Sequence, residues 1–320
     1  MNRTFSVLDA RSHEWKRRRQ WWIDRYNIQS EKGREDLLTD VGLFNKKRIS
    51  VFDAYLTELV YTWFLSKSGN KVLDPFAGGS VRGIVCNALG HQYTGIDISS
   101  SQVDANRLQS DEPQWIVGNA DTVLDSIYDD FDLVFTCPPY HNLEVYSDNK
   151  EDLSNQDYET FLINYGSIIK KSVSKLKDNR FFVIVVSEIR DYLDGYYTEG
   201  FYKGLVKDTQ VLAEQSGLHY YNELILLNAT GNAALMENKY FNKNKKFARV
   251  HQNVLVFVKG NPDLATIELS DDDYICEIDG VKYKSFRHAA ISIDPHKQVP
   301  SRIEKKCRSN KPKYDNWRML

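Results

Sequence analysis

The sequence is poor in cysteine and has no long apolar run. Its four cysteines, Cys86, Cys137, Cys276 and Cys307, are widely spaced, with no Cys-x-x-Cys pair. This spacing predicts neither a zinc site nor a disulfide framework, and it fits the reducing cytoplasm. No stretch approaches the roughly 18 apolar residues of a membrane-spanning helix, and no signal-peptide pattern opens the chain. We therefore expect a cytoplasmic protein that binds neither metal nor membrane.

The chain also lacks a strong overall charge, since its formal net charge is −2. Global charge therefore does not identify a nucleic-acid partner, and local charge is more informative. Residues 14–22 combine four basic residues with three tryptophans, and residues 274–320 hold eleven Lys or Arg against five Asp or Glu. Both segments have the composition of phosphate-binding surfaces. The alternatives are a solvated helix face and a basic structural tail.

Apolar runs alternate with helical patterns along most of the chain. Amphipathic helices are expected at residues 51–64, 81–89, 99–108, 161–176 and 204–216. Strands are expected at residues 71–74, 92–97, 114–117, 131–135, 180–186, 221–227 and 254–258. Because each strand is almost continuously apolar, the pattern predicts an α/β fold, in which helices cover both faces of a parallel, Rossmann-like sheet.

Three strand ends carry residues suited to a ligand, which in open α/β sheets binds beyond the carboxyl ends of the strands. The first is the turn at residues 74–80, whose two glycines allow a tight turn and close approach to a ligand. The second is Asp97, about 20 residues further on, which is suited to ribose hydroxyls. The third spans residues 119–121, where Asp121 can accept from an adenine amino group. Plain turns and helix capping are the alternatives.

The fourth strand runs into Cys137, Pro138, Pro139 and Tyr140. Two consecutive prolines fix φ and remove two backbone donors, so the loop offers rigid carbonyl oxygens at the tip of a strand. These carbonyl oxygens can bind the hydrogens of an exocyclic amine, while the Tyr140 ring lies against the planar base. Together they can direct the amine at a methyl donor. An ordinary proline turn is the alternative. The spacing from turn to acid also fits nicotinamide binding, but the turn is not Gly-x-Gly-x-x-Gly, and this loop disfavours a dehydrogenase.

The chain resembles the amino-methyltransferases of DNA, which make N6-methyladenine or N4-methylcytosine, and in particular those encoded by phages and prophages. The likeness covers roughly residues 6–260, and its motifs occur in the family's order. These motifs are the segments 6–11, 50–53, 72–83, 94–97, 136–140, 143–147 and 251–257. The resemblance implies a class I methyltransferase domain at residues 48–262, after a basic and aromatic extension at residues 1–47.

The resemblance also implies a cofactor, a substrate and a set of site residues. The cofactor would be S-adenosylmethionine, and the substrate a flipped-out base of double-stranded DNA in a bacterial host cell. In the family, the Gly-rich turn would hold the methionine part of the cofactor, Asp97 would bind the ribose, and Asp121 would lie at the adenine. The implied cofactor-binding residues are Phe52, Asp74, Phe76, Ala77, Gly78, Gly79, Ser80, Asp97, Ile98, Asn119 and Asp121. The implied catalytic residues, which would receive the base, are Cys137, Pro138, Pro139 and Tyr140.

Cys137 departs from the family pattern, which usually has Asp, Asn or Ser at this position. A thiol is a weak hydrogen-bond acceptor, and in shape it is closest to Ser, which is more typical of the N4-cytosine enzymes. The target therefore stays open between adenine and cytosine. A nucleophilic cysteine, as in C5-cytosine methylation, is disfavoured because that cysteine follows the paired prolines, whereas this one precedes them.

Three further segments bear on the substrate. Residues 228–250 form a polar, Asn-rich and basic insertion that is suited to DNA contacts, with an active-site lid as the alternative. Residues 187–191 are expected either to line the base pocket or to pair charges within their loop. Residues 273–320 predict a hairpin and two helices that resemble the helix-turn-helix NUMOD modules of homing endonucleases. Arg302, Lys305 and Lys306 would lie on the helix that enters a major groove.

We therefore interpret the chain as an S-adenosylmethionine-dependent DNA amino-methyltransferase that catalyses mainly by positioning. An RNA or protein amide methyltransferase is the enzymatic alternative, since related Pro-Pro-Tyr loops serve those substrates. A DNA-binding protein with an inactive transferase core is the non-enzymatic alternative, for which Cys137 is the reason.

Overall fold

The computed structural model describes residues 5–29, 51–141, 151–193, 196–229, 238, 241–269, 276–279, 281–284, 286–293, 300–308 and 317–319. The family motif at residues 143–147 and the turn expected near residue 294 lie outside the described residues, as does part of the insertion at residues 228–250. No helix in the described ranges is long and apolar enough to cross a membrane.

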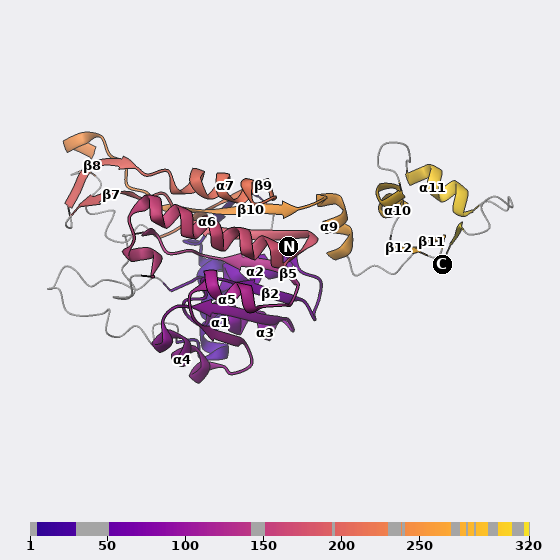
Figure 1. The fold of residues 1–320 in the computed structure, drawn as a ribbon, viewed down its shortest axis with the longest axis horizontal. Coiled ribbons are helices and arrows are strands. Elements are labelled where there is room, and N and C mark those ends of the chain that lie inside the picture. Colours follow the sequence, from indigo (N-terminus) through magenta and orange to yellow (C-terminus); the bar gives the residue numbers. More distant parts are fainter. Residues whose placement is uncertain are drawn as a thin grey trace.

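In the described chain, eight strands form the central sheet, in the order β1-β9-β10-β6-β5-β2-β3-β4. Their bounds are β1 (Val7–Asp9), β2 (Lys71–Asp74), β3 (Gln92–Asp97), β4 (Gln114–Val117), β5 (Phe131–Thr136), β6 (Leu176–Val186), β9 (His219–Leu227) and β10 (His251–Lys259). Strand β10 runs antiparallel to its neighbours β6 and β9, and the other neighbouring pairs are parallel. The predicted α/β fold with a mostly parallel, Rossmann-like sheet is confirmed (Figure 1).

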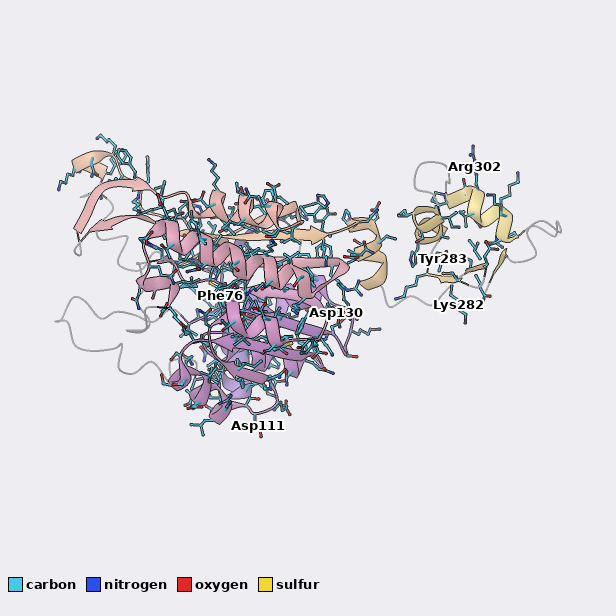
Figure 2. The ribbon with its side chains drawn as sticks, viewed as in Figure 1. Phe76, Asp111, Asp130, Lys282, Tyr283 and Arg302 are labelled. Carbon is cyan, nitrogen blue, oxygen red and sulfur yellow. The ribbon has the colours of Figure 1, made fainter. Side chains whose placement is uncertain are left out.

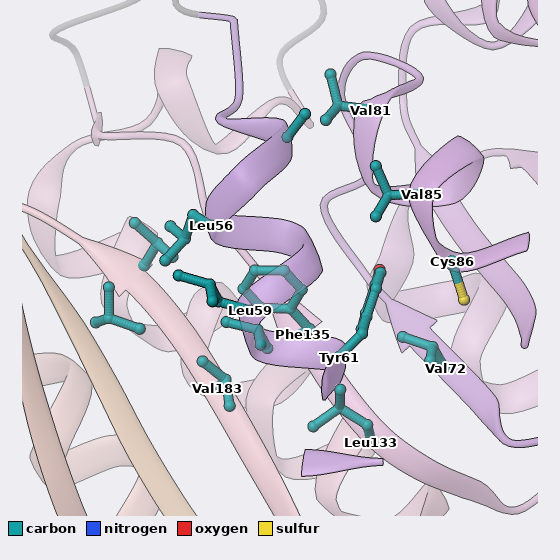
Figure 3. Close-up of a cluster of buried hydrophobic side chains, with 14 of the residues drawn as sticks. Leu56, Leu59, Tyr61, Val72, Val81, Val85, Cys86, Leu133, Phe135 and Val183 are labelled. Carbon is teal, nitrogen blue, oxygen red and sulfur yellow. The ribbon is translucent and has the colours of Figure 1, made fainter. Parts of the chain in front are cut away.

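Helices cover both faces of this sheet (Figure 1). They are α1 (His13–Tyr26), α2 (Ala54–Phe64), α3 (Val81–Ala88), α4 (Ser100–Gln109), α5 (Ala120–Ser126), α6 (Tyr158–Lys175), α7 (Leu205–Gln215) and α9 (Pro262–Leu269). Successive residues of a strand point to opposite faces. Leu133, Phe135 and Val183 accordingly join α2 in one core cluster (Figure 3). Val134 and Phe182 join α6 in the other.

Some elements lie where the sequence predicted none. A hairpin of β7 (Arg190–Leu193) and β8 (Tyr196–Tyr202) follows β6, and α9 follows β10. The sequence predicted no helix directly after residue 258, but Pro262 is the first residue of α9. A proline is tolerated at this position because the first N–H groups of a helix have no partner within the helix. The side chain of Asn261 caps the helix by accepting from the amide of Asp263 at 2.8 Å.

The N-terminal segment, predicted as an extension, contributes to the sheet domain. Strand β1 pairs in parallel with β9. Helix α1 packs on α2 through Trp15 and Trp22, both buried, and Trp22 Nε1 donates to Glu58 Oε2 at 2.6 Å. The two inward rings lie seven residues apart on an otherwise charged helix, so the apolar face is too sparse to stand out in the sequence.

The C-terminal elements form a small unit with its own core (Figure 1). Strand β11 (Cys276–Ile278) lies between β12 (Val281–Tyr283) and β13 (Trp317–Met319), beside α10 (Phe286–Ile293) and α11 (Pro300–Cys307). The buried core residues are Cys276, Ile278, Tyr283, Ala289, Ala290, Ile303 and Cys307. The expected hairpin and two helices are thus present, and the assignment of the unit to the NUMOD type stays a prediction.

Replacing Trp22 with Ala tests whether α1 belongs to the fold. The substitution should lower the free energy of unfolding by about 3–5 kcal/mol, because it removes a fully buried ring. Trp21→Ala is the matched control, since the Trp21 ring is exposed, and it should cost less than about 1 kcal/mol. Urea unfolding followed by circular dichroism measures both. Equal costs for the two variants would contradict the packing described.

Candidate functional site

A cavity of about 840 Å³ opens at the carboxyl edge of the sheet, beyond β2, β3, β5 and β6. This volume lies in the range typical of sites for small molecules. Twelve of the fifteen predicted site residues line it, namely Phe52, Phe76, Ala77, Gly78, Gly79, Asp97, Ile98, Asn119, Cys137, Pro138, Pro139 and Tyr140. The structure therefore brings the two predicted groups of residues, for cofactor and for base, to one cavity. The remaining three, Asp74, Ser80 and Asp121, are not among its lining residues.

Asp74 is fully buried beneath the cavity. One carboxylate oxygen accepts from Arg82 Nε at 2.5 Å and from the hydroxyl of Tyr93 at 2.7 Å. The other accepts from the hydroxyl of Thr136 at 2.7 Å and from the amide of Phe76 at 3.1 Å. The expected ligand contact of Asp74 is therefore replaced by a structural one, which joins β2, α3, β3 and β5 at a single carboxylate.

Arg82 extends this buried cluster toward the Gly-rich turn. Burial opposes its charge, but the nearby carboxylate of Asp74 raises the pKa of the guanidinium above its ordinary value. The guanidinium Nη2 donates to the backbone carbonyls of Phe76 at 2.7 Å and Ala77 at 3.0 Å, and the ring of Phe52 lies 4.3 Å from it. Arg82 thus holds the turn in place from behind. No sequence pattern marked Arg82 as a site residue, although it lies in the first turn of α3, directly after the glycines.

The Gly-rich turn is closed by Asp97. Gly78 has φ of +53°, a left-handed conformation that glycine adopts without strain. Its amide donates to Asp97 Oδ2 at 2.8 Å, and its carbonyl accepts from Asn106 Nδ2 at 2.7 Å. Asp97 Oδ1 accepts from the amide of Ser99 at 2.8 Å, at the start of α4. The carboxylate therefore lies at the cavity wall and also orders the loops on both sides of it.

Two other predicted cofactor residues turn away from the cavity. Ser80 is buried and donates to Gln109 Oε1 at 3.0 Å. Asp121 accepts from the hydroxyl of Ser167 at 2.5 Å and pairs with Lys171 at 3.2 Å, both on α6. Of the segment 119–121, Asn119 and Ala120 line the cavity. Asn119 Oδ1 accepts from the amide of Asp121 at 3.0 Å and caps α5. The adenine contact assigned to Asp121 stays a prediction.

The loop at residues 137–140 crosses the sheet edge directly after β5. Cys137 packs against the core cluster on the α2 face, and Tyr140 packs against the cluster on the α6 face. Cys137 Sγ lies 3.8 Å from the hydroxyl of Tyr140. The loop therefore contacts the core clusters on both faces of the sheet, and the Cys137 thiol and the Tyr140 phenol lie side by side in the cavity wall.

A hydrogen-bonded chain holds the Tyr140 phenol. Asn228 Nδ2 donates to Gln252 Oε1 at 3.1 Å, and Gln252 Nε2 donates to the Tyr140 hydroxyl at 2.6 Å. Because the carboxamide oxygen of Gln252 receives Asn228, its NH2 group is directed at the phenol. The phenol oxygen is then an acceptor toward Gln252, and its own hydrogen can be donated elsewhere, with Cys137 Sγ within reach.

The cavity is also lined by Ser187, Glu188, Arg249 and His251. Glu188 also caps α7, since its two oxygens accept from the amides of Gly204 at 3.1 Å and Val206 at 3.0 Å. Of residues 187–191, Ser187 and Glu188 thus line the cavity, and their contact with a base stays a prediction. Burial, and then the positive charge of Arg249, lowers the pKa of His251 below its ordinary value.

Two cavity residues that the sequence did not predict, His251 and Gln252, begin β10. In a parallel strand these residues would lie at the far edge of the sheet. Because β10 is antiparallel, with Asn253 beside Val186, its first residues meet the last residues of β6 at the cavity. Lys16 and Arg19 of α1 also line the cavity, and the packing of α1 on the domain explains their place. Within the described ranges, no group of three or more His, Cys, Asp or Glu could hold a metal ion.

Comparisons with known proteins give one curated relative and several solved structures. The chain is 40% identical over 65 residues to the Type II methyltransferase M.Cfr9I of Citrobacter freundii, a match that spans 19% of this chain and 22% of that relative. TrmN from Thermus thermophilus is 12% identical, with a TM-score of 0.43 over 65% of this chain and 49% of its own. A TehB-like SAM-dependent methyltransferase from Corynebacterium glutamicum is 18% identical, with a TM-score of 0.39 over 63% of this chain and 86% of its own.

A family model described as DNA methylase matches residues 131–319. The match begins at β5, includes the loop at residues 137–140, and extends into the C-terminal unit. It therefore covers the strand end that carries the predicted catalytic residues. Since the matched residues make up more than half of the 320-residue chain, the chain belongs to the DNA methylase family.

Proposed function

We propose that the protein transfers the methyl group of S-adenosylmethionine to an exocyclic amino group of a base in DNA, N6 of adenine or N4 of cytosine. The observation that carries this proposal is one cavity lined by the Gly-rich turn, by Asp97 and by the Cys-Pro-Pro-Tyr loop. Membership of the DNA methylase family supports it.

S-adenosylmethionine would bind in the cavity along the ends of β2, β3 and β4, where Gly78, Asp97 and Gly118 line it. The turn at Gly78 and Gly79 offers backbone without side chains at the cavity wall, which suits close approach by the methionine part. We assign the ribose hydroxyls to Asp97, which lines the cavity, and the adenine to Asn119 in place of Asp121, which does not. When bound, the sulfonium of this cofactor supplies an electrophilic methyl group without a metal.

The loop at residues 137–140 would receive the base. The two prolines hold the loop rigid, and the Tyr140 ring can stack on a base that has left the duplex, which offsets part of the few kcal/mol of unstacking. The amine nitrogen would attack the methyl carbon as its bond to the sulfonium sulfur breaks, which releases S-adenosylhomocysteine. The methylated amine would lose its proton to solvent afterwards, so no strongly basic side chain is required. The contribution of the protein is then mainly the alignment of amine and methyl donor.

The finer identity of the enzyme belongs to the same proposal. We infer a phage- or prophage-type enzyme of the bacterial cytoplasm that acts on double-stranded DNA. We also infer that the C-terminal unit is a helix-turn-helix module of the NUMOD type. Exposed Arg302 and Lys305 lie on one side of α11, and Arg302 points away from the unit (Figure 2). Cys137 leaves the choice between adenine and cytosine open.

Competition between acceptors tests the proposed substrate. Duplex DNA, RNA and protein are offered together with S-adenosylmethionine that carries a tritiated methyl group. We expect the label in duplex DNA. Label in RNA or protein would support an RNA or protein amide methyltransferase instead, and no detectable binding of S-adenosylmethionine by calorimetry would support an inactive core.

Substitution of the base-receiving loop separates catalysis from cofactor binding. Tyr140→Ala and Pro139→Ala should each abolish methyl incorporation into DNA. Calorimetry should show that both variants still bind S-adenosylmethionine, because the Gly-rich turn and Asp97 are untouched. If tritiated methyl groups still reached DNA in both variants, this assignment of the base site would be wrong.

Gln252 should act as a positioning residue through Tyr140. Gln252→Leu removes the donor that holds the phenol and should lower the rate of methyl transfer by about 10- to 100-fold, with unchanged cofactor affinity. In a Tyr140→Phe background there is no hydroxyl to hold, so Gln252→Leu should have little further effect. Additive losses in the double variant would show that Gln252 acts by another route.

The C-terminal unit should strengthen binding of duplex DNA through phosphate contacts. The double substitution Arg302→Ala and Lys305→Ala should reduce the slope of log affinity against log salt by about two, as expected for two lost phosphate contacts. Fluorescence anisotropy with a labelled duplex measures this slope. An unchanged slope would remove α11 from the DNA interface.

A further inference from the structure

A surface of aromatic and basic side chains lies beside the cavity, on the hairpin of β7 and β8 and on residues 241–249. Figure 1 shows the hairpin projecting from the end of the sheet, with the helical turn of residues 241–244 next to β8. We call the side chains of Arg190, Phe201, Tyr202, Phe241, Lys243, Lys245 and Phe247 the hairpin surface. Neither the fold nor the proposed chemistry accounts for it.

The two segments that carry this surface pack on each other. The ammonium group of Lys246 packs against the backbone of Gly200. A Cβ atom built on Gly200 would lie only 1.6 Å from Lys246 Nζ, so a larger residue would displace this lysine. Within the hairpin, the guanidinium of Arg190 donates to the carbonyl of Gly200 and lies 3.9 Å from the Tyr202 ring. The hairpin and residues 241–249 therefore form one unit.

The aromatic side chains of this unit are directed to solvent. Phe201 is 65% exposed and Phe247 is 75% exposed, which leaves most of each ring outside any core. The Phe247 ring contacts Phe241, with ring centres 5.2 Å apart. A cluster of exposed aromatic rings of this kind marks a surface that binds a partner.

The charge of the surface indicates an anionic partner. Residues 241–250 contain Lys243, Lys245, Lys246 and Arg249 and no acidic residue. Lys243 and Lys245 are exposed, and Lys245 Nζ lies 4.6 Å from the Phe241 ring. Cations that alternate with exposed rings suit nucleic acid, in which phosphates take the charges and bases stack on the rings.

The position of the surface links it to the catalytic cavity. Arg249, in the same segment, donates through Nε to Ser187 at 3.0 Å, and both residues line the cavity. Phe247 is only two residues away from Arg249. A duplex that presents a base to Tyr140 would therefore have its flanking nucleotides within reach of this surface.

We propose that the hairpin surface binds the DNA duplex beside the target base. Lys243 and Lys245 contact phosphates, and the Phe247 ring stacks on a base exposed when the target leaves the helix. This inference rests on the proposed function, because it takes the base in the cavity to come from duplex DNA. It adds a binding surface distinct from both the cavity and α11.

The test uses substitutions in the full-length protein and two kinds of probe. Phe247→Ala removes the stacking ring, and Lys243→Ala with Lys245→Ala removes two phosphate contacts. The matched controls are Tyr128→Ala, whose ring is 93% exposed before β5, and Lys170→Ala on the exposed side of α6. The probes are plasmid DNA for methyl incorporation and a fluorescent duplex for binding.

We expect Phe247→Ala to slow plasmid methylation about tenfold. The double lysine variant should weaken duplex binding and reduce its salt slope by about two. Both controls should match the wild type, and calorimetry should show unchanged affinity for S-adenosylmethionine in every variant. Surface variants that behave like the controls would overturn the proposal.

Two further outcomes separate this inference from its premises. If the wild type bound the duplex but methylated no plasmid, the proposed function would fail, and the lysine variant would still decide the binding surface. Basic and aromatic surfaces also bind anionic membranes. If the wild type cosedimented with phosphatidylserine vesicles, and the surface substitutions weakened that binding but not duplex binding, the partner would be a membrane and the proposal would be wrong.

Discussion

The site depends on the buried carboxylate of Asp74. It accepts hydrogen bonds from Arg82 on α3, Tyr93 on β3 and Thr136 at the end of β5, and a charge at this depth without partners would cost several kcal/mol. Burial, and then the charge of Asp74, raises the pKa of Tyr93 well above its ordinary value, so this phenol remains a donor. The Gly-rich turn and the loop at residues 137–140 are therefore tied to one carboxylate, and such preorganisation favours catalysis by alignment.

The reversal of β10 supplies the second constraint. It places Gln252 against Tyr140 and His251 near the end of β6. The antiparallel strand β10 thus contributes to the same cavity as the parallel strands. Burial and the charge of Arg249 lower the pKa of His251 and so weaken its imidazole as a base, and both carboxylate oxygens of Glu188 accept hydrogen bonds from the start of α7. This arrangement agrees with an amine that attacks first and loses its proton later.

The sequence predicted what local patterns encode and missed what the fold brings together. Apolar runs and the Gly-rich turn predicted the parallel strands and the cavity edge, because the central strands such as β2 and β5 are buried on both faces. Asp74 and Asp121 were assigned to the ligand because an acid at a strand end looks the same whether it faces ligand or protein. The partner of Asp121, Lys171, lies 50 residues away on a helix that only the fold brings near. Arg82 is only eight residues from Asp74, but the sequence does not show that its side chain turns back to this carboxylate. The direction of β10 is likewise not encoded in its apolar run.

The central claim is that one cavity aligns a methyl donor with an exocyclic amine of a DNA base. The most direct measurement is mass spectrometry of nucleosides from a plasmid treated with the wild-type protein and S-adenosylmethionine that carries a deuterated methyl group. The account predicts the labelled methyl on N6 of adenine or N4 of cytosine. Label at C5 of cytosine would contradict it, because that product requires Cys137 to act as a nucleophile. DNA without label, from protein that binds the cofactor, would contradict it as well.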